Sequence, residues 1–152
     1  MVTSADCIKK YGQPDPGNSC LTNWKVPEDI RKECKVLPKI MYNVNKDMVT
    51  SLAQAFRNLI SAGKISEIKV YGGCFCIRAK KGNPTVFSLH SWAIAIDLNM
   101  KDNVYKLNRE QLIAKGLMPF SEEFINCLRL AGFVAGADWK TPDFMHFELS
   151  KL

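Results

Sequence analysis

The sequence lacks several features that would place it outside the soluble globular class. None of its apolar runs approaches the roughly 20 residues that a membrane-spanning helix needs. It has no internal repeat and no low-complexity tract, and its glycines and prolines are scattered, which excludes disordered and fibrous classes. The first residues, MVTSADCIKKYG, lack the cationic start and apolar core of a secretory signal. We therefore expect a protein made without a signal peptide and without stable membrane insertion.

Cysteine pairs with the spacing of a metal or redox motif are also missing. No two of the cysteines form a Cys-x-x-Cys pair, which excludes a zinc ribbon and a thioredoxin motif. A disulfide among Cys7, Cys20 and Cys34 is one alternative, because that part of the chain is rich in turn residues. Buried free thiols are the other alternative, and the missing export signal favours them.

Acidic residues are fewer than basic ones, with 15 aspartates and glutamates against 21 lysines and arginines, which gives a net charge of +6 and a pI near 9.0. Such a charge favours an anionic partner, which could be nucleic acid, an anionic membrane surface or the bacterial cell wall. The clearest basic spot, AKKGNP at 79–84, has the composition of a solvated turn. The sequence contains neither an aromatic and basic RNP-type strand nor C2H2 spacing, so we expect no nucleic-acid binding.

The length of 152 residues and the 47% hydrophobic content fit one domain over 1–152 with a buried core. Prolines interrupt residues 1–43, so we expect this part to be an irregular segment packed on the domain. Apolar residues at helical spacing predict a helix from Asn45, as its N-cap, to Gly63. The stretch ISEIKVYG, residues 65–72, then predicts a strand whose apolar residues are Ile65, Ile68 and Val70.

The second half of the chain mixes short helices with strands. Capping residues and terminal glycines predict helices over 108–116 and 121–132, and the patterns at 92–98 and 144–150 predict strands. No regular βαβ repeat connects them. This order indicates an α+β fold with a small, mainly antiparallel sheet and flanking helices.

Histidine occurs only twice, and each histidine stands near acids. On the strand after His90, period-two geometry places Asp97 on the same face as Ala93 and Ala95, where small neighbours leave room for an ion or a substrate. His90 has the parity of the opposite face, so it can join Asp97 only if the chain bends near Ser91.

The second histidine motif is DFMHFELS, near the end of the chain. His146 and Glu148 share one strand face, and Asp143 lies in a turn three residues before His146. Two imidazoles and one carboxylate are three of the four ligands of a catalytic zinc site, and an acid close to the metal but not bound to it can act as general base. In the alternative interpretation both residues have a purely structural role: His90 is a core or capping residue, and Asp97 is a turn residue. The helical His-Glu-x-x-His signature is absent, which excludes the thermolysin-like class.

Four stretches of the sequence resemble the M15 family of zinc peptidases, which comprises D-alanyl-D-alanine carboxypeptidases and L-alanyl-D-glutamate endopeptidases. SLHSWAIAIDLN resembles the family motif Ser-x-His-x-x-Gly-x-Ala-x-Asp, and GFVAGADWKTPDFMHFE resembles its closing segment. GGCFCIR is similar to the segment that supplies a substrate-facing arginine. The opening ADCIKKYG resembles the phage-endolysin branch of the family.

This resemblance implies a hedgehog/D,D-peptidase-like fold and a role for each matching residue. It makes His90, Asp97 and His146 ligands of Zn²⁺, and Asp143 the catalytic base. Arg78 would steady the developing oxyanion or a substrate carboxylate, and Ser88 and Trp139 would lie on the substrate side. The sequence departs from the family at Ala93, where the motif has glycine, and at VAGAD (134–138), which replaces a more aromatic, glycine-rich version.

The function that the resemblance implies is hydrolysis of the peptide stem of bacterial peptidoglycan. The expected bond is L-Ala–D-Glu, cut by a monomeric endolysin that is made in the host cytoplasm and acts on the wall after release. One alternative is a D,D-carboxypeptidase that removes terminal D-Ala. The other is a non-catalytic zinc module of the same fold, which needs neither Asp143 nor Arg78.

Overall fold

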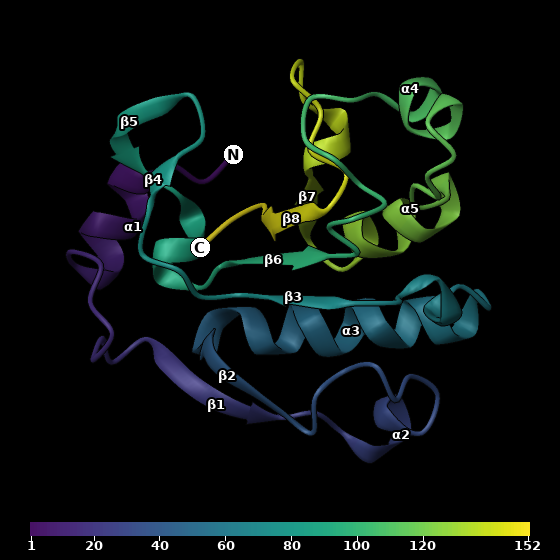
Figure 1. Ribbon diagram of the computed structural model, residues 1–152. Helices are drawn as coiled ribbons and strands as arrows, with labels where there is room; N and C mark the ends of the chain where they lie inside the picture. Colours follow the sequence, from purple (N-terminus) through teal and green to yellow (C-terminus); the bar gives the residue numbers. More distant parts are fainter.

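A computed structural model describes residues 1–152 and shows an α+β fold with antiparallel sheets, as the sequence predicted (Figure 1). The central sheet has four strands in the order β3-β6-β8-β7. Its strands are β3 (Tyr71–Gly73), β6 (Ala95–Leu98), β8 (His146–Leu149) and β7 (Phe133–Ala135). Two further sheets are two-stranded: β1 (Leu21–Lys25) with β2 (Ile40–Asn45), and β4 (Ala79–Lys80) with β5 (Asn83–Phe87).

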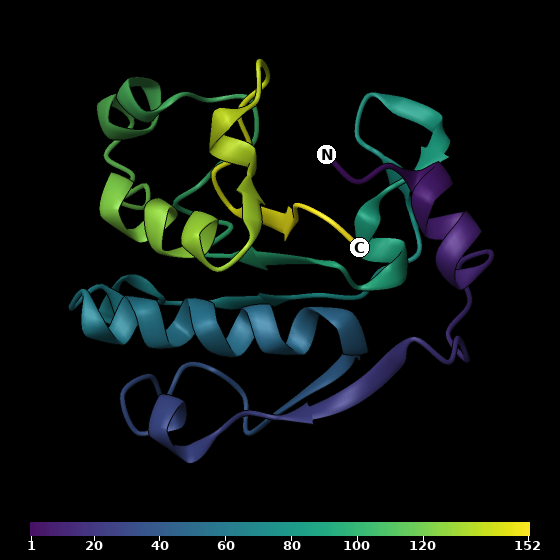
Figure 2. The ribbon, with the colours of Figure 1, turned by 180° about the vertical axis from the view of Figure 1, so that it is seen from behind.

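The helix α3 (Val49–Ser61) lies between the central sheet and the β1–β2 pair (Figures 1 and 2). The side chain of Asn45 accepts a hydrogen bond from the backbone of Asp47, so Asn45 caps a short 3-10 turn, η1 (Lys46–Met48), that leads into the helix. The helix buries Leu52, Ala55, Phe56 and Leu59, the stripe that the apolar spacing predicts. On the far side, the ring of Trp24 stacks on that of Phe56, with 6.4 Å between centroids.

The first 43 residues contain more regular structure than the sequence predicted. They form α1 (Ser4–Tyr11), β1, the single turn α2 (Glu28–Arg31) and the start of β2. A capping box between Thr3 and Asp6 begins α1, and the indole of Trp92 donates to the carbonyl of Gly12 just past its end. These elements are too short for periodicity to reveal, and packing on the rest of the chain stabilises them.

The strand predicted over 65–72 is present only at its end and is wrong for residues 65–70. Residues Ile65–Glu67 form a 3-10 turn, η2, and β3 begins only at Tyr71. The backbone N–H groups of Lys69 and Val70 donate to the side chain of Asn99, at 2.8 and 2.9 Å, rather than to a neighbouring strand. A side chain that replaces a strand partner in this way leaves no signal in the alternation of residues 65–70.

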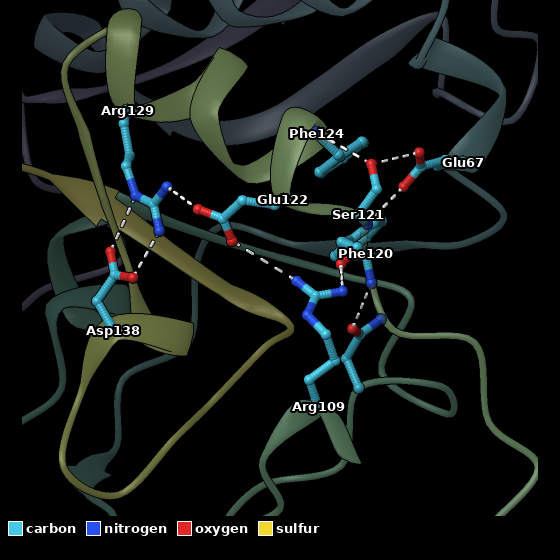
Figure 3. Close-up of polar contacts among 9 residues, drawn as sticks. Glu67, Arg109, Phe120, Ser121, Glu122, Phe124, Arg129 and Asp138 are labelled. Carbon is cyan, nitrogen blue, oxygen red and sulfur yellow. Dashed lines mark hydrogen bonds and ion pairs between the residues drawn. The ribbon is translucent and has the colours of Figure 1, made fainter. Parts of the chain in front are cut away.

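The two predicted helices of the second half are present as α4 (Arg109–Ala114) and α5 (Glu122–Leu130), capped by Asn108 and Ser121. Figure 3 shows the polar contacts around them. Ser121 donates to Glu67, and Arg129 forms a bidentate pair with Asp138 and a further bond to Glu122. Asp138 ends the turn η4 (Gly136–Asp138), so this network ties α5 to the segment that carries Asp143.

Buried apolar residues form a cluster of 33 that includes members from α1 to β8. All six cysteines are free thiols, and five of them are buried. Burial raises the pKa of Cys7 to about 12, so this thiol stays protonated at neutral pH. No helix has both the length and the apolar character to cross a bilayer.

Candidate metal centre

The centre is built on one face of the strands β6 and β8. Asp97 pairs directly with His146 in their antiparallel register, and Ala95 pairs with Glu148. Successive side chains on a strand point to opposite faces, so these four residues share one face. Residues of the opposite face, such as Ile96 and Phe147, are buried in the core.

His90 reaches this face from a different kind of element. It lies in the 3-10 turn η3 (Leu89–Trp92), whose first backbone groups are capped by the hydroxyl of Ser88. The chain then reverses through Ala93, which has the left-handed values φ 53° and ψ 33°, and the strand begins only at Ala95, not at Trp92 as the pattern predicted. The predicted bend therefore exists and brings His90 over the sheet.

The left-handed conformation of Ala93 explains why the family motif has glycine at this position. Glycine adopts positive φ without cost, whereas a Cβ atom disfavours it. Ala93 is fully buried, and it keeps the backbone turn that the motif glycine would make freely.

Three candidate ligand atoms meet on this face. The Nε2 atom of His90 and the Nδ1 atom of His146 each lie 3.1 Å from Oδ1 of Asp97, and the two nitrogens are 3.2 Å apart. All three atoms lie within 4.8 Å of one another. The structure thus brings together His90, Asp97 and His146, although 56 residues of sequence separate His90 from His146. Two imidazole nitrogens and a carboxylate oxygen form a donor set suited to Zn²⁺.

The remaining ring nitrogens are held by acceptors outside the cluster, which supports the fit to a metal ion. Nδ1 of His90 lies 2.8 Å from the carbonyl oxygen of Cys74 and therefore carries the proton, which leaves the lone pair of Nε2 facing the cluster. Nε2 of His146 lies 2.9 Å from Oε2 of the buried Glu148. Metal-bound histidines commonly donate their other N–H to a carbonyl or carboxylate in this manner.

Electrostatics at the cluster favour charged side chains. Burial acts to raise the pKa of Asp97, but hydrogen bonds from His146 and His90 outweigh it and hold that pKa well below its usual range. Burial acts to lower the pKa of His146, but the hydrogen bonds to Asp97 and Glu148 outweigh it and raise the pKa to about 9. At neutral pH the metal-free protein therefore holds His146 as imidazolium between two carboxylates.

Metal binding at pH 7.5 is expected to release about one proton per ion, because the ion must displace the proton on Nδ1 of His146. The affinity should rise with pH until about 9, where His146 is already neutral in the metal-free protein. Calorimetric titration with zinc in two buffers of different ionisation enthalpy measures the released protons. Equal heats in both buffers would show that His146 is neutral beforehand.

Glu148 was not among the predicted site residues, although its strand parity with His146 was visible in the sequence. Replacing Glu148 with alanine should lower metal affinity by about 10- to 100-fold, because the His146 ring loses the acceptor that orients it. Glu148→Gln should lower it less, since the amide oxygen still accepts. Competition with a chromogenic chelator measures both, and unchanged affinity in Glu148→Ala would contradict this role.

Asp143 is placed beside the cluster by a close backbone approach. Its N–H donates to the carbonyl of Gly136, and its carbonyl accepts from the N–H of His146, at 2.9 and 3.1 Å. A Cβ atom on Gly136 would collide with the carbonyl oxygen of Asp143, so the VAGAD segment requires glycine here. Burial raises the pKa of Asp143, against the lowering effect of Lys81, and its buried Oδ1 has no hydrogen-bond partner.

A cleft with a volume of about 570 Å³ opens over this face. All the predicted site residues that are not candidate metal ligands line this cleft. Arg78, Ser88 and Trp139 all line it, and the Trp139 ring lies 5.1 Å from that of His146. The guanidinium of Arg78 makes no hydrogen bond or ion pair within the chain. The other arginines all donate to a carbonyl or a carboxylate: Arg31, Arg57, Arg109 and Arg129.

The cleft also contains residues that the sequence analysis did not assign to a site. The AKKGNP stretch, which had the composition of a solvated turn, forms the β4–β5 hairpin, and its Lys80 and Lys81 line the cleft with Tyr105. A short lysine pair before a turn is common on surfaces. Only the position of the hairpin beside the cluster distinguishes this pair.

A small α+β sheet that presents two histidines and an aspartate to an open cleft, beside a buried acid, is the arrangement of a metal-dependent hydrolase. Residues 81–149 match a family model of the M15 peptidases, described as D-alanyl-D-alanine carboxypeptidase. The M15 resemblance is thereby confirmed over the part of the chain that contains both histidine motifs. Searches of curated proteins and of solved structures gave no match.

Proposed function

We propose that the protein is a zinc metallopeptidase that hydrolyses the peptide stem of bacterial peptidoglycan at the L-Ala–D-Glu bond, in the manner of a phage endolysin. The observation that carries the proposal is the convergence of His90, Asp97 and His146 on one sheet face, with Asp143 beside them on the wall of a cleft. The match to an M15 peptidase family supports it. A monomer released from the cytoplasm to act on the wall is part of the same proposal.

Zinc, when bound, would polarise the scissile carbonyl and lower the pKa of a water from about 15.7 toward about 7. His90 and His146 would hold it through Nε2 and Nδ1, and Asp97 through Oδ1, because these atoms face one another. The outer hydrogen bonds to the Cys74 carbonyl and to Glu148 fix both imidazole rings in the orientation that this binding needs.

The other residues of the cleft divide the remaining chemistry. Asp143 accepts the proton of the attacking water and delivers it to the departing amine, a role that suits a buried carboxylate whose pKa is raised and whose Oδ1 has no partner in the chain. Arg78 has a free guanidinium and opposes the negative charge that develops on the carbonyl oxygen.

The experiment that tests the proposal is digestion of purified cell walls by the zinc-loaded protein, followed by mass spectrometry of the released products. An L-Ala–D-Glu endopeptidase releases most of the stem peptide, because it cuts near the sugar-linked end. Release of D-Ala alone would identify a D,D-carboxypeptidase, the alternative that the description of the matching family favours. Zinc binding without any product would instead identify a non-catalytic zinc module.

A further inference from the structure

The β4–β5 hairpin places two lysines in the wall of the cleft that opens over the metal centre. Lys80 ends β4, and Lys81 forms the two-residue turn with Gly82 before Asn83. The ammonium of Lys80 lies 5.8 Å from the centroid of the Trp139 ring. The ammonium of Lys81 lies 4.5 Å from the Tyr105 ring centroid and 3.8 Å from Oδ2 of Asp143. The hairpin therefore reaches residues that are far away in the sequence.

The base of the hairpin is fixed, so the lysines are presented from a defined position. The backbone N–H of Ser88 donates to the carbonyl of Arg78 at 2.9 Å, and the hydroxyl of Ser4 donates to the carbonyl of Phe87 at 2.6 Å. The Phe87 ring also packs edge-on against Trp92, which is buried next to His90. The two lysines and the metal centre thus belong to one connected framework.

Positive charge around the cleft is not neutralised by the chain itself. Lys80, Lys140 and Arg78 line the cleft and make no ion pair. Lys81 has one, a long contact to Asp143 with the lysine side chain 44% exposed, and such contacts are weak. Of the two carboxylates that line the cleft, Glu148 holds His146 and Asp143 has only the contact with Lys81, so the cations of the cleft outnumber the anions available to them.

A neutral donor at the same wall also lacks a partner. The indole N–H of Trp139 is buried and has no acceptor in the structure, although Trp139 lines the cleft under the ammonium of Lys80. Buried donors are nearly always satisfied, so an orphaned donor in the wall of a cleft needs an explanation, and pairing with an acceptor on a ligand is one. Ammonium groups and an indole N–H donate only, so the complementary ligand is an acceptor with negative charge.

We propose that Lys80 and Lys81, together with the indole N–H of Trp139, form a subsite that binds a carboxylate of the substrate. The proposal rests on the proposed peptidase function and adds a specificity to it: the cleft selects acidic peptides. Lys81 would exchange its weak contact with Asp143 for the substrate carboxylate. The aromatic rings of Trp139 and Tyr105 hold both ammonium groups over the cleft until the substrate arrives.

The test compares two peptides that contain an L-Ala–γ-D-Glu bond and differ only in whether the α-carboxyl group of D-Glu is free or amidated. Wild type and the double variant Lys80→Gln/Lys81→Gln, both loaded with zinc, are assayed on each peptide. The double variant should lower kcat/KM for the acidic peptide by about tenfold or more, mainly through KM, because charge-assisted hydrogen bonds are lost. Any effect through the contact of Lys81 with Asp143 is common to both peptides, so the ratio of kcat/KM for the acidic peptide to kcat/KM for the amidated peptide should fall by about tenfold.

Lys35→Gln/Lys39→Gln is the matched control, because it removes the same charge from exposed lysines between α2 and β2, on the far side of α3 (Figure 1). This control should behave as wild type, which separates local binding from long-range attraction. Unchanged discrimination between the two peptides in Lys80→Gln/Lys81→Gln would overturn the subsite and assign the carboxylate to Arg78.

Binding of the same peptides by calorimetry keeps the two proposals distinguishable. If wild type hydrolyses neither peptide, the proposed function fails, and the subsite is then decided by affinity alone. It stands if the acidic peptide binds wild type about tenfold more tightly than Lys80→Gln/Lys81→Gln, and it is wrong if the affinities are equal.

Discussion

Replacing Asp143 with alanine is expected to lower kcat by about 10²- to 10⁴-fold while leaving the metal bound, because a general base contributes on that order and the three ligand atoms remain. Asp143→Asn should behave similarly, since the amide keeps the shape of the side chain but cannot accept a proton. Release of stem peptide from purified walls measures the rate, and elemental analysis of the same samples measures zinc.

Asp102→Asn is the matched control for this pair, because it removes one carboxylate that makes no side-chain contact with the centre. Its activity and zinc content should equal those of wild type. If Asp143→Ala instead loses zinc, Asp143 is a ligand rather than the base. If it retains full activity, another group takes the proton, and the hydrolytic role derived from its burial is wrong.

Replacing His146 with alanine is expected to remove both metal binding and hydrolysis. Two of the three ligand atoms remain, and Asp97 and Glu148 lose the cation that now lies between them. For wild type, zinc at 100 times its Kd should stabilise the fold by about 2.7 kcal/mol, or roughly 5–10 °C in Tm for a chain of this size. His146→Ala should show no such shift.

Thermal unfolding with zinc and with a chelator measures this difference, and circular dichroism shows whether the variant is folded. His90→Ala is a second test of the same metal centre, because the Nε2 atom of His90 lies in the same cluster. His90 belongs to a different segment of the chain from His146, so a shared effect points to the metal rather than to local structure. Both variants should lose the zinc-dependent shift. A His146→Ala protein that still binds zinc with wild-type affinity would remove the basis for the metal centre.

The sequence allowed the helices to be predicted where capping residues and apolar spacing agree. Asn45, Asn108 and Ser121 all cap the turns that were expected, since a cap is a local interaction between a side chain and the next few backbone groups. The sequence did not reveal that the hydrogen bonds of residues 69 and 70 are taken by the side chain of Asn99. That contact joins segments about thirty residues apart.

The sequence by itself determined which side chains can do chemistry: it has only two histidines, each near acids, so residue type and spacing made a metal site one interpretation. The resemblance to the M15 family then implied the roles of His90, Asp97, His146 and Asp143. Only the tertiary structure decided how they meet. The register of β6 against β8 pairs Asp97 with His146, and the left-handed turn at Ala93 brings His90 over the same face. Likewise, only the tertiary structure shows that Lys80 and Lys81 line the cleft. The local sequence of a hairpin does not specify which distant residues it contacts.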